Sequence, residues 1–206
     1  MGNVIDALKI CISRGNSKMG AIPSVSLPAI LTCRKCGCNE LCYACKGTFK
    51  FRNVSESLER NLKILRLDPG GYWRQVNEAV AMSRFFRFHV SGDIPNYEYF
   101  CRMVETAAKN PHCEILCFTK RYNFVNRFIK IKGWYPKNLH IIFSGWRDLK
   151  MVNPYNLPEA HVRFKDGFCE AKPEAIECYG NCTECSVAGC GCWKLGLGEQ
   201  VVFNQH

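Results

Sequence analysis

Two short cysteine-rich segments hold ten of the fifteen cysteines of this 206-residue chain. The first, CRKCGCNELCYACKG, contains the spacing C-x3-C-x2-C at Cys38, Cys42 and Cys45, and Cys33 and Cys36 precede it. Three thiolates on one loop can bind a [4Fe–4S] cluster and leave one iron without a protein ligand, open to a substrate or cofactor. A fourth thiolate would instead favour electron transfer or a structural role. We expect metal ligands at Cys33, Cys38, Cys42 and Cys45.

The second cysteine-rich segment lies towards the C-terminus and repeats this spacing. Cys178, Cys182 and Cys185 form the triplet, and Cys190 and Cys192 follow it in GCGCW. We expect these five thiols to hold an auxiliary cluster. If the two ends of the chain meet in space, one of these C-terminal cysteines instead supplies a fourth ligand to the N-terminal cluster.

Zinc and disulfide bonds are the alternatives to iron, since four thiolates also form a tetrahedral zinc site. An odd number of cysteines cannot pair completely within one chain. The N-terminus lacks the continuous apolar stretch of a signal peptide, which predicts a cytoplasmic protein with reduced thiols. The number of soft ligands therefore favours one or two [4Fe–4S] clusters over zinc. The candidate zinc sets are Cys33, Cys36, Cys42 and Cys45, and Cys182, Cys185, Cys190 and Cys192.

Strand and helix patterns alternate between the two cysteine-rich segments. Short apolar runs predict strands, and apolar residues at helical spacing predict helices between them. This alternation is typical of an α/β fold with a parallel sheet and helices outside. With roughly four to six units, an incomplete (β/α) barrel is favoured over a closed one. The predicted strands are 85–90, 113–119, 139–145 and 160–166, and the predicted helices are 55–67, 72–84, 96–110 and 123–132.

The chain is expected to form one domain, residues 1–206, in three parts. Ser55 or Ser57 is expected to cap the first helix, and Pro69, Gly70 and Gly71 are expected to form a turn before the second. The three parts are a loop-rich segment with the first cysteine cluster (1–54), the β/α units (55–168) and the second cysteine-rich segment (169–206).

Small and polar residues follow three of the predicted strands, in HVSGDIP, CFTKR and FSGWR. The carboxyl ends of parallel strands meet at one edge of a sheet, where α/β folds bind ligands. Turns use Ser, Gly and Asp for conformational reasons alone, but three such turns favour a common pocket, which Arg147 should also face. The candidates are Ser91, Gly92, Asp93, Thr119 and Ser144 for cofactor binding, and Asp93 and Lys120 for catalysis.

The formal net charge of +10 predicts either a solvated basic surface or an anionic partner such as nucleic acid. Basic and aromatic residues interleave most clearly in residues 120–134, as in a platform on which bases stack. Phe124 and Phe128, however, have the spacing of the buried face of a helix. Because no apolar run approaches the ~20 residues of a membrane span, no membrane partner is expected.

Several segments resemble the gene product 88 family of phage- and plasmid-borne proteins. They are NSKMGAIPSVSLPAILTC, CNELCYACKG, HVSGDIPNYEYF, CFTKR and CGCWKLGLGEQVVFNQH, and the resemblance covers nearly the whole chain. More distantly, the chain is similar to the barrels of radical S-adenosylmethionine enzymes, in which a cysteine loop precedes a strand that ends in a Gly-Gly-Glu turn. There the methionine amino and carboxyl groups chelate the open iron, and the turn contacts the amino group. The resemblance implies this role for residues 91–95, with Asp93 as the shortened acid.

The sequence departs from the radical-SAM pattern at its aromatic residue. This residue usually precedes the third cysteine, but Ala44 takes that place and Tyr43 follows the second cysteine. The gene product 88 resemblance implies that Cys42 pairs as a ligand with upstream cysteines such as Cys33 and Cys38. In that case Cys45, the third cysteine of the triplet, need not be a ligand.

Three functions are compatible with these patterns. The first is a radical-SAM-like enzyme with an open [4Fe–4S] cluster that binds S-adenosylmethionine. The others are a nucleic-acid-binding protein stabilised by closed clusters or zinc, and an electron-transfer protein with a closed cluster. His89, His140 and His161 lie in or beside strands and are expected in the core. His206, the last residue, could reach a metal.

Overall fold

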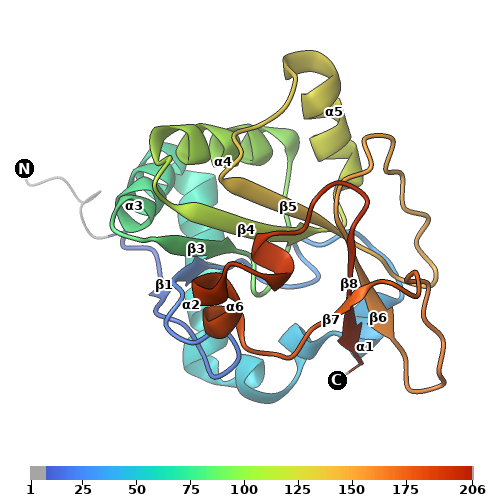
Figure 1. The fold of residues 1–206 in the computed structure, drawn as a ribbon. Coiled ribbons are helices and arrows are strands. Elements are labelled where there is room, and N and C mark those ends of the chain that lie inside the picture. The colour runs from blue at the N-terminus through green and yellow to red at the C-terminus, as the bar shows by residue number, and fades with distance from the viewer. Residues whose placement is uncertain (1–7, 206) are drawn as a thin grey trace, which may run out of the picture.

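A mostly parallel eight-stranded sheet runs through residues 8–205, which the computed structural model describes (Figure 1). The strand order is β1-β2-β3-β4-β5-β6-β8-β7, with β1 antiparallel to β2 and the other neighbours parallel. The predicted α/β fold with a parallel sheet and helices outside is therefore confirmed. The strands are β1 (Ile12–Ser13), β2 (Ser24–Val25), β3 (Phe85–Phe88), β4 (Glu114–Thr119), β5 (Leu139–Ser144), β6 (Glu159–Arg163), β7 (Ile176–Glu177) and β8 (Gln200–Asn204).

Helices cover the two sides of the sheet unequally. In Figure 1, α4 and α5 lie above the central strands, whereas the C-terminal helix α6 lies below them. The helices are α1 (Cys38–Leu41), α2 (Arg52–Leu67), α3 (Pro69–Ala81), α4 (Tyr97–Lys109), α5 (Tyr122–Lys132) and α6 (Cys182–Ala188), and the short 3-10 helices are η2 (Tyr43–Cys45), η3 (Gly47–Lys50) and η4 (Gly191–Trp193).

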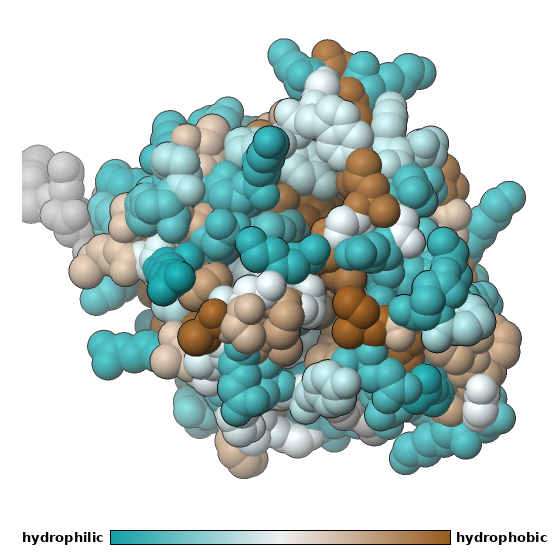
Figure 2. Space-filling view, viewed as in Figure 1, coloured by the Kyte–Doolittle hydropathy of each residue, from teal (hydrophilic) through white to brown (hydrophobic). Residues whose placement is uncertain are grey.

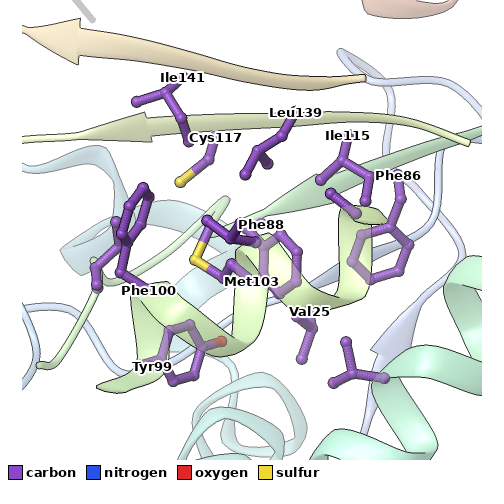
Figure 3. Packing of buried hydrophobic residues seen from close by; sticks show 14 of the residues in the cluster. Val25, Phe86, Phe88, Tyr99, Phe100, Met103, Ile115, Cys117, Leu139 and Ile141 are labelled. Atoms are coloured by element: carbon purple, nitrogen blue, oxygen red, sulfur yellow. The ribbon is translucent and has the colours of Figure 1, made fainter. Parts of the chain in front are cut away.

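The outer face of the sheet forms the main core with helices α2 to α5. Phe86, Phe88 and Ile115 point to this face because side chains alternate along a strand, and all three are fully buried. Met103 and Phe100 of α4 pack among them (Figure 3). Burying each such side chain stabilises the fold by about 1.5–3 kcal/mol, so this core fixes the sheet and therefore the edge where its strands end.

The inner face of the sheet packs against the C-terminal segment. Leu116, Ile142 and Val201 form a second apolar cluster with Trp193, whose ring centroid is 5.2 Å from that of Phe85. Four half-buried cysteines pack against this cluster. They are Cys178, Cys182, Cys185 and Cys192.

The predicted start of the first helix is wrong. Helix α2 begins at Arg52, with Phe51 as its N-cap. The hydroxyls of Ser55 and Ser57 donate to helix carbonyls of the preceding turn, at 3.1 and 2.7 Å, and do not cap the helix. Serine can also make this bond inside a helix, so its presence alone did not locate the start.

The predicted turn before the second helix is also wrong. Pro69, Gly70 and Gly71 form the first turn of α3, and Asp68 caps it by accepting a hydrogen bond from the Gly71 amide at 2.8 Å. Proline suits this position because the first amides of a helix have no partner within the helix.

The ends of the chain contain more strands than predicted. Strands β1 and β2 lie in the expected loop-rich part, and β8 was not predicted at all. Strand β8 pairs in parallel with β6, with Ala160 opposite Val201, and so brings the C-terminal segment back to the sheet. Within residues 8–205, no helix is both long and apolar enough to cross a bilayer.

Candidate metal centre

The carboxylate of Asp93 joins the ends of β3 and β4. It accepts hydrogen bonds from the Thr119 hydroxyl at 2.6 Å, the Ile94 amide at 2.7 Å and the Lys120 amide at 2.9 Å. Asp93 is 5% exposed, and burial raises its pKa although the three hydrogen bonds oppose the rise. The carboxylate is thus held at the predicted edge, with much of its acceptor capacity used within the protein.

Lys120 extends along the same edge to the end of β5. Its ammonium donates to the Ser144 hydroxyl at 3.0 Å and lies 5.8 Å from the centre of the Trp146 ring. Ser91 is buried in the turn that carries Asp93, and its hydroxyl has no hydrogen-bond partner among residues 8–205. The polar residues that follow three different strands therefore meet at one edge, as predicted.

Contrary to expectation, the side chain of Arg147 contacts the chain that follows β6 and not Asp93, Lys120 or Ser144. Its guanidinium forms two hydrogen bonds to Asp166, at 2.9 and 3.1 Å, and lies 3.7 Å from the centre of the Phe164 ring. These contacts hold the side chain against the chain that follows β6, because the planar guanidinium pairs with a carboxylate and stacks on an aromatic ring at once.

Thr32 docks the N-terminal cysteine loop on the turn after β3. Its hydroxyl oxygen accepts a hydrogen bond from the Asp93 amide at 3.1 Å, and Cys33 follows it directly. Gly92 has φ +79°, and a β-carbon there would lie 2.6 Å from the hydroxyl oxygen of Thr32. Glycine is therefore required both for the backbone conformation and for the close approach of loop and turn.

Two further contacts attach the cysteine loop. The Gly37 amide donates to the Asp148 carboxylate at 2.6 Å, which ties the loop to the chain after β5. The Tyr43 hydroxyl donates to the carbonyl of Val90, beyond the end of β3. The loop is thus fixed at both ends over the carboxyl edge of the sheet.

The thiols of this loop share one cation. Burial raises the pKa of Cys33 to about 11 and also raises that of Cys42. The sulfurs of Cys36 and Cys38 are 2.8 Å apart, and the hydrogen bond between them lowers the pKa of Cys36 to about 6 and raises that of Cys38. The charge of the Lys120 ammonium acts on all four of these thiols: it opposes the rise in pKa at Cys33, Cys38 and Cys42 and adds to the lowering at Cys36. A cation beside a thiol favours the thiolate, which is the form that binds metal.

The five C-terminal thiols lie together on the inner side of the sheet. Burial raises the pKa of Cys185 to about 11 and that of Cys192 to about 12, and neighbouring thiols add to both shifts. The thiols that act on Cys185 include Cys178, Cys182 and Cys190. All five residues predicted as the auxiliary ligand set therefore belong to one group.

Arg87 of β3 is the cation of this second group. Burial raises the pKa of Cys182, but the charge of Arg87 and a hydrogen bond from it oppose the rise. The guanidinium carbon lies 5.0 Å from the centre of the Phe118 ring, and Nε is buried without a hydrogen-bond partner among residues 8–205. The ion pairs of these residues include none to Arg87. A cation removed from water needs an anion, and the thiols of this group can supply it once ionised.

Tyr43 lies between the two thiol groups. Its side chain is 44% exposed, but its hydroxyl points inward, where burial raises its pKa. The charge of Arg87 opposes the rise, whereas thiols of both groups, Cys42 and Cys182 among them, add to it. Thiols of both groups therefore lie within electrostatic reach of the Tyr43 hydroxyl.

The donor set fits an iron–sulfur cluster in its chemistry. All fifteen cysteines are free thiols, which are soft ligands, and a cation stands beside each group. Within residues 8–205, no three His, Cys, Asp or Glu side chains lie close enough to hold a single metal ion. A [4Fe–4S] cluster does not need its ligands this close together, because each cysteine binds a different iron. His206 lies outside the described residues.

Three residues that position the site were missed in the sequence. Arg87 carried a signal, because it is a charged residue at an inner-face position of an otherwise apolar strand. Thr32 and Asp148 carried none, since their partners, Asp93 and Gly37, are 61 and 111 residues away.

The aromatic residues of the basic segment 120–134 are mostly core. Tyr122 is 1% exposed, and Phe124 and Phe128 pack against the outer-face core, which confirms the buried helix face. Only Trp134 among these four rings is freely exposed, at 56%. On the face seen in Figure 2, hydrophilic residues are interspersed with apolar ones over the whole surface.

These features define a cysteine-rich α/β protein whose N-terminal thiol loop lies over the carboxyl edge of a mostly parallel sheet. A family model described as gene product 88 matches residues 9–179, so the chain belongs to the gene product 88 family, as its sequence motifs predicted. No curated protein and no solved structure matches the chain.

Proposed function

We propose that this protein is an iron–sulfur enzyme of the radical-SAM type, with a [4Fe–4S] cluster held by the N-terminal cysteine loop. One observation carries the proposal: a single ammonium, that of Lys120, acts on four thiols at the carboxyl edge of the sheet. A thiolate-bound cluster is anionic, so a fixed cation beside it favours its binding.

The order of elements supports the radical-SAM comparison. The cysteine loop follows β2, the first strand of the parallel part of the sheet, and β3 ends in the turn that contains Gly92 and Asp93. This is the same sequence of cysteine loop, strand and Gly-acidic turn that the resemblance implies. Asp93 is shorter than glutamate and is already bonded to three donors, so we assign it a positioning role in that turn.

The edge residues have separate tasks in this proposal. When bound, a [4Fe–4S] cluster with an open iron supplies the electron for reductive cleavage of S-adenosylmethionine. Lys120 binds the carboxylate of the methionine moiety, and Ser144 orients the Lys120 ammonium by accepting its hydrogen bond. Thr119 holds the Asp93 carboxylate, and with it the backbone of the turn that faces the cofactor.

The C-terminal thiols are proposed to hold an auxiliary cluster. Their support is Arg87, whose guanidinium lies among them without a carboxylate partner in residues 8–205. A cluster bound by thiolates would neutralise this charge. The ligands would come from Cys178, Cys182, Cys185, Cys190 and Cys192.

The test is the metal content of protein purified without oxygen, followed by electron paramagnetic resonance of the reduced sample. Iron and sulfide in equal amounts, with a spectrum that changes on adding S-adenosylmethionine, would support an open iron. Iron with an unchanged spectrum would move the protein to a closed cluster and to electron transfer or nucleic-acid binding. Zinc alone would overturn the proposal.

A further inference from the structure

A polar pocket of about 500 Å³ lies between the ends of β5 and β6, and one of its lining residues, Asp148, also holds the N-terminal cysteine loop through the Gly37 amide. Its lining includes Gly145, Lys150, Glu159, His161 and Glu170. This volume is within the range of small-molecule sites. Strand register pairs Glu159 with Phe143, a residue of the outer-face core, so Glu159 and His161 point to the outer face, whereas the C-terminal thiols pack on the inner face.

The Glu159 carboxylate fixes the orientation and tautomer of His161. It accepts hydrogen bonds from the side chains of Asn153 at 2.9 Å and Gln200 at 2.7 Å, and it lies 3.0 Å from Nε2 of His161. The contact with His161 lowers the pKa of Glu159, so the carboxylate is ionised and can only accept. Nε2 therefore carries a proton, and in the neutral imidazole the lone pair is on Nδ1.

Gly145 lies beside Nδ1 of His161, and both residues line the pocket. Gly145 is not among the glycines with positive φ, so its conformation does not require glycine. A β-carbon at this position would lie only 2.9 Å from Nδ1 of His161, so any side chain there would crowd this nitrogen. His161 is 7% exposed, and among residues 8–205 no hydrogen bond reaches its Nδ1.

We propose that this pocket binds a small organic anion that also carries a hydroxyl or amino group. The ligand donates its O–H or N–H to Nδ1 of His161, beside Gly145. When Nδ1 takes up the proton, Glu159 stabilises the imidazolium, as a carboxylate does in a catalytic dyad. Lys150, exposed at the rim, suits the carboxylate or phosphate of such a ligand.

Diethyl pyrocarbonate, which acylates imidazole nitrogens with a free lone pair, is the first probe. His161 should be modified in the folded protein. Gly145→Ala should slow this modification at least tenfold, because the added methyl group would lie against Nδ1 of His161. Gly196→Ala, where a β-carbon meets only ordinary contacts, should leave the rate unchanged. His112 is exposed and contacts the Ala81 carbonyl, so modification of His112 serves as the internal reference for the activity of the reagent. An unmodified His161, or an unchanged rate in Gly145→Ala, would overturn the proposal.

Protection experiments test the ligand class. Malate, which has a hydroxyl group, should slow modification of His161 at least fivefold more than succinate, which lacks one. The variant Lys150→Ala changes an exposed side chain, so it should fold normally and lose the protection by malate. Equal effects of malate and succinate on wild-type protein would overturn the assignment. Thermal unfolding of each variant confirms that it is folded.

Discussion

The Thr119 hydroxyl donates a hydrogen bond to the Asp93 carboxylate at 2.6 Å and so links the ends of two adjacent parallel strands. Both residues are buried, at 1% and 5% exposure. The carboxylate also receives the amides of Ile94 and Lys120, so this pair sets the backbone from which Lys120 reaches the thiols. Stability and the geometry of the candidate site therefore depend on the same bond.

Replacing Thr119 by valine tests this link. The Thr119→Val variant keeps the shape of the side chain but leaves a buried carboxylate oxygen with one donor fewer and the Arg121 amide without its acceptor. We expect a loss of about 1–3 kcal/mol in the free energy of unfolding, measured with urea. Thr48→Val is the matched control, because Thr48 is exposed. Equal stability of the two variants would contradict a structural role for the bond.

Gly92→Ala should separate backbone strain from steric contact at the turn. Gly92 and Gly133 have similar φ angles, +79° and +83°, but only at Gly92 would a β-carbon meet other atoms, at 2.6 Å. Gly133→Ala should cost about 1 kcal/mol for conformation alone. Gly92→Ala should cost at least twice as much and also reduce bound iron, because it displaces Thr32 and the loop. Equal losses of stability with unchanged iron would show that the loop does not depend on this contact.

Much of the fold could be predicted because its signals are local. Apolar runs such as EILCFT and helical spacing in residues 96–110 record burial directly, and β4 and α4 were found within one residue of their ends. Strand β8 was missed because its five residues gain their partner from β6, about 40 residues earlier. The helix starts at Arg52 and Pro69 were missed because Ser, Pro and Gly serve both turns and helix ends.

The candidate site was only partly predictable. The edge residues were found because turns after parallel strands must meet, whatever the distance along the chain. The pairing of each thiol group with a cation could not be seen, since Arg87 and Cys182 are far apart in sequence and meet only across the inner face of the sheet. His161 was correctly expected in the core, but its contact with Gly145 depends on the register of β5 and β6.

His89 should make the protein sensitive to acid. It is 3% exposed, neither ring nitrogen has a partner within residues 8–205, and burial, with the charge of Arg87, lowers its pKa to about 3. Below the ordinary pKa of about 6.5 the unfolded chain binds a proton that the folded chain does not, so stability falls as pH decreases from there towards pH 3. We expect a loss of about 2 kcal/mol between pH 7.5 and 5, measured by urea unfolding.

The variant His89→Asn tests the source of this loss. Asparagine does not titrate, and it tolerates the left-handed conformation of His89, φ +60°. Between pH 7.5 and 5 this variant should therefore lose about 2 kcal/mol less free energy of unfolding than the wild-type protein. His112→Asn, which removes a histidine on the surface, should retain the wild-type dependence. A wild-type pH profile in His89→Asn would assign the acid sensitivity to other groups.

Single cysteine variants should show whether the two thiol groups hold separate clusters. If they do, Cys42→Ser and Cys182→Ser should each lose about half of the bound iron, because each removes one ligand set and spares the other. Cys101→Ser, which changes a thiol outside both groups, should retain all of it. Loss of all the iron in both variants would instead indicate one cluster shared between the groups, an arrangement that the position of Tyr43 between them allows. If the C-terminal cysteine is the fourth ligand of that cluster, no iron is open, and this result would also remove the basis for binding S-adenosylmethionine.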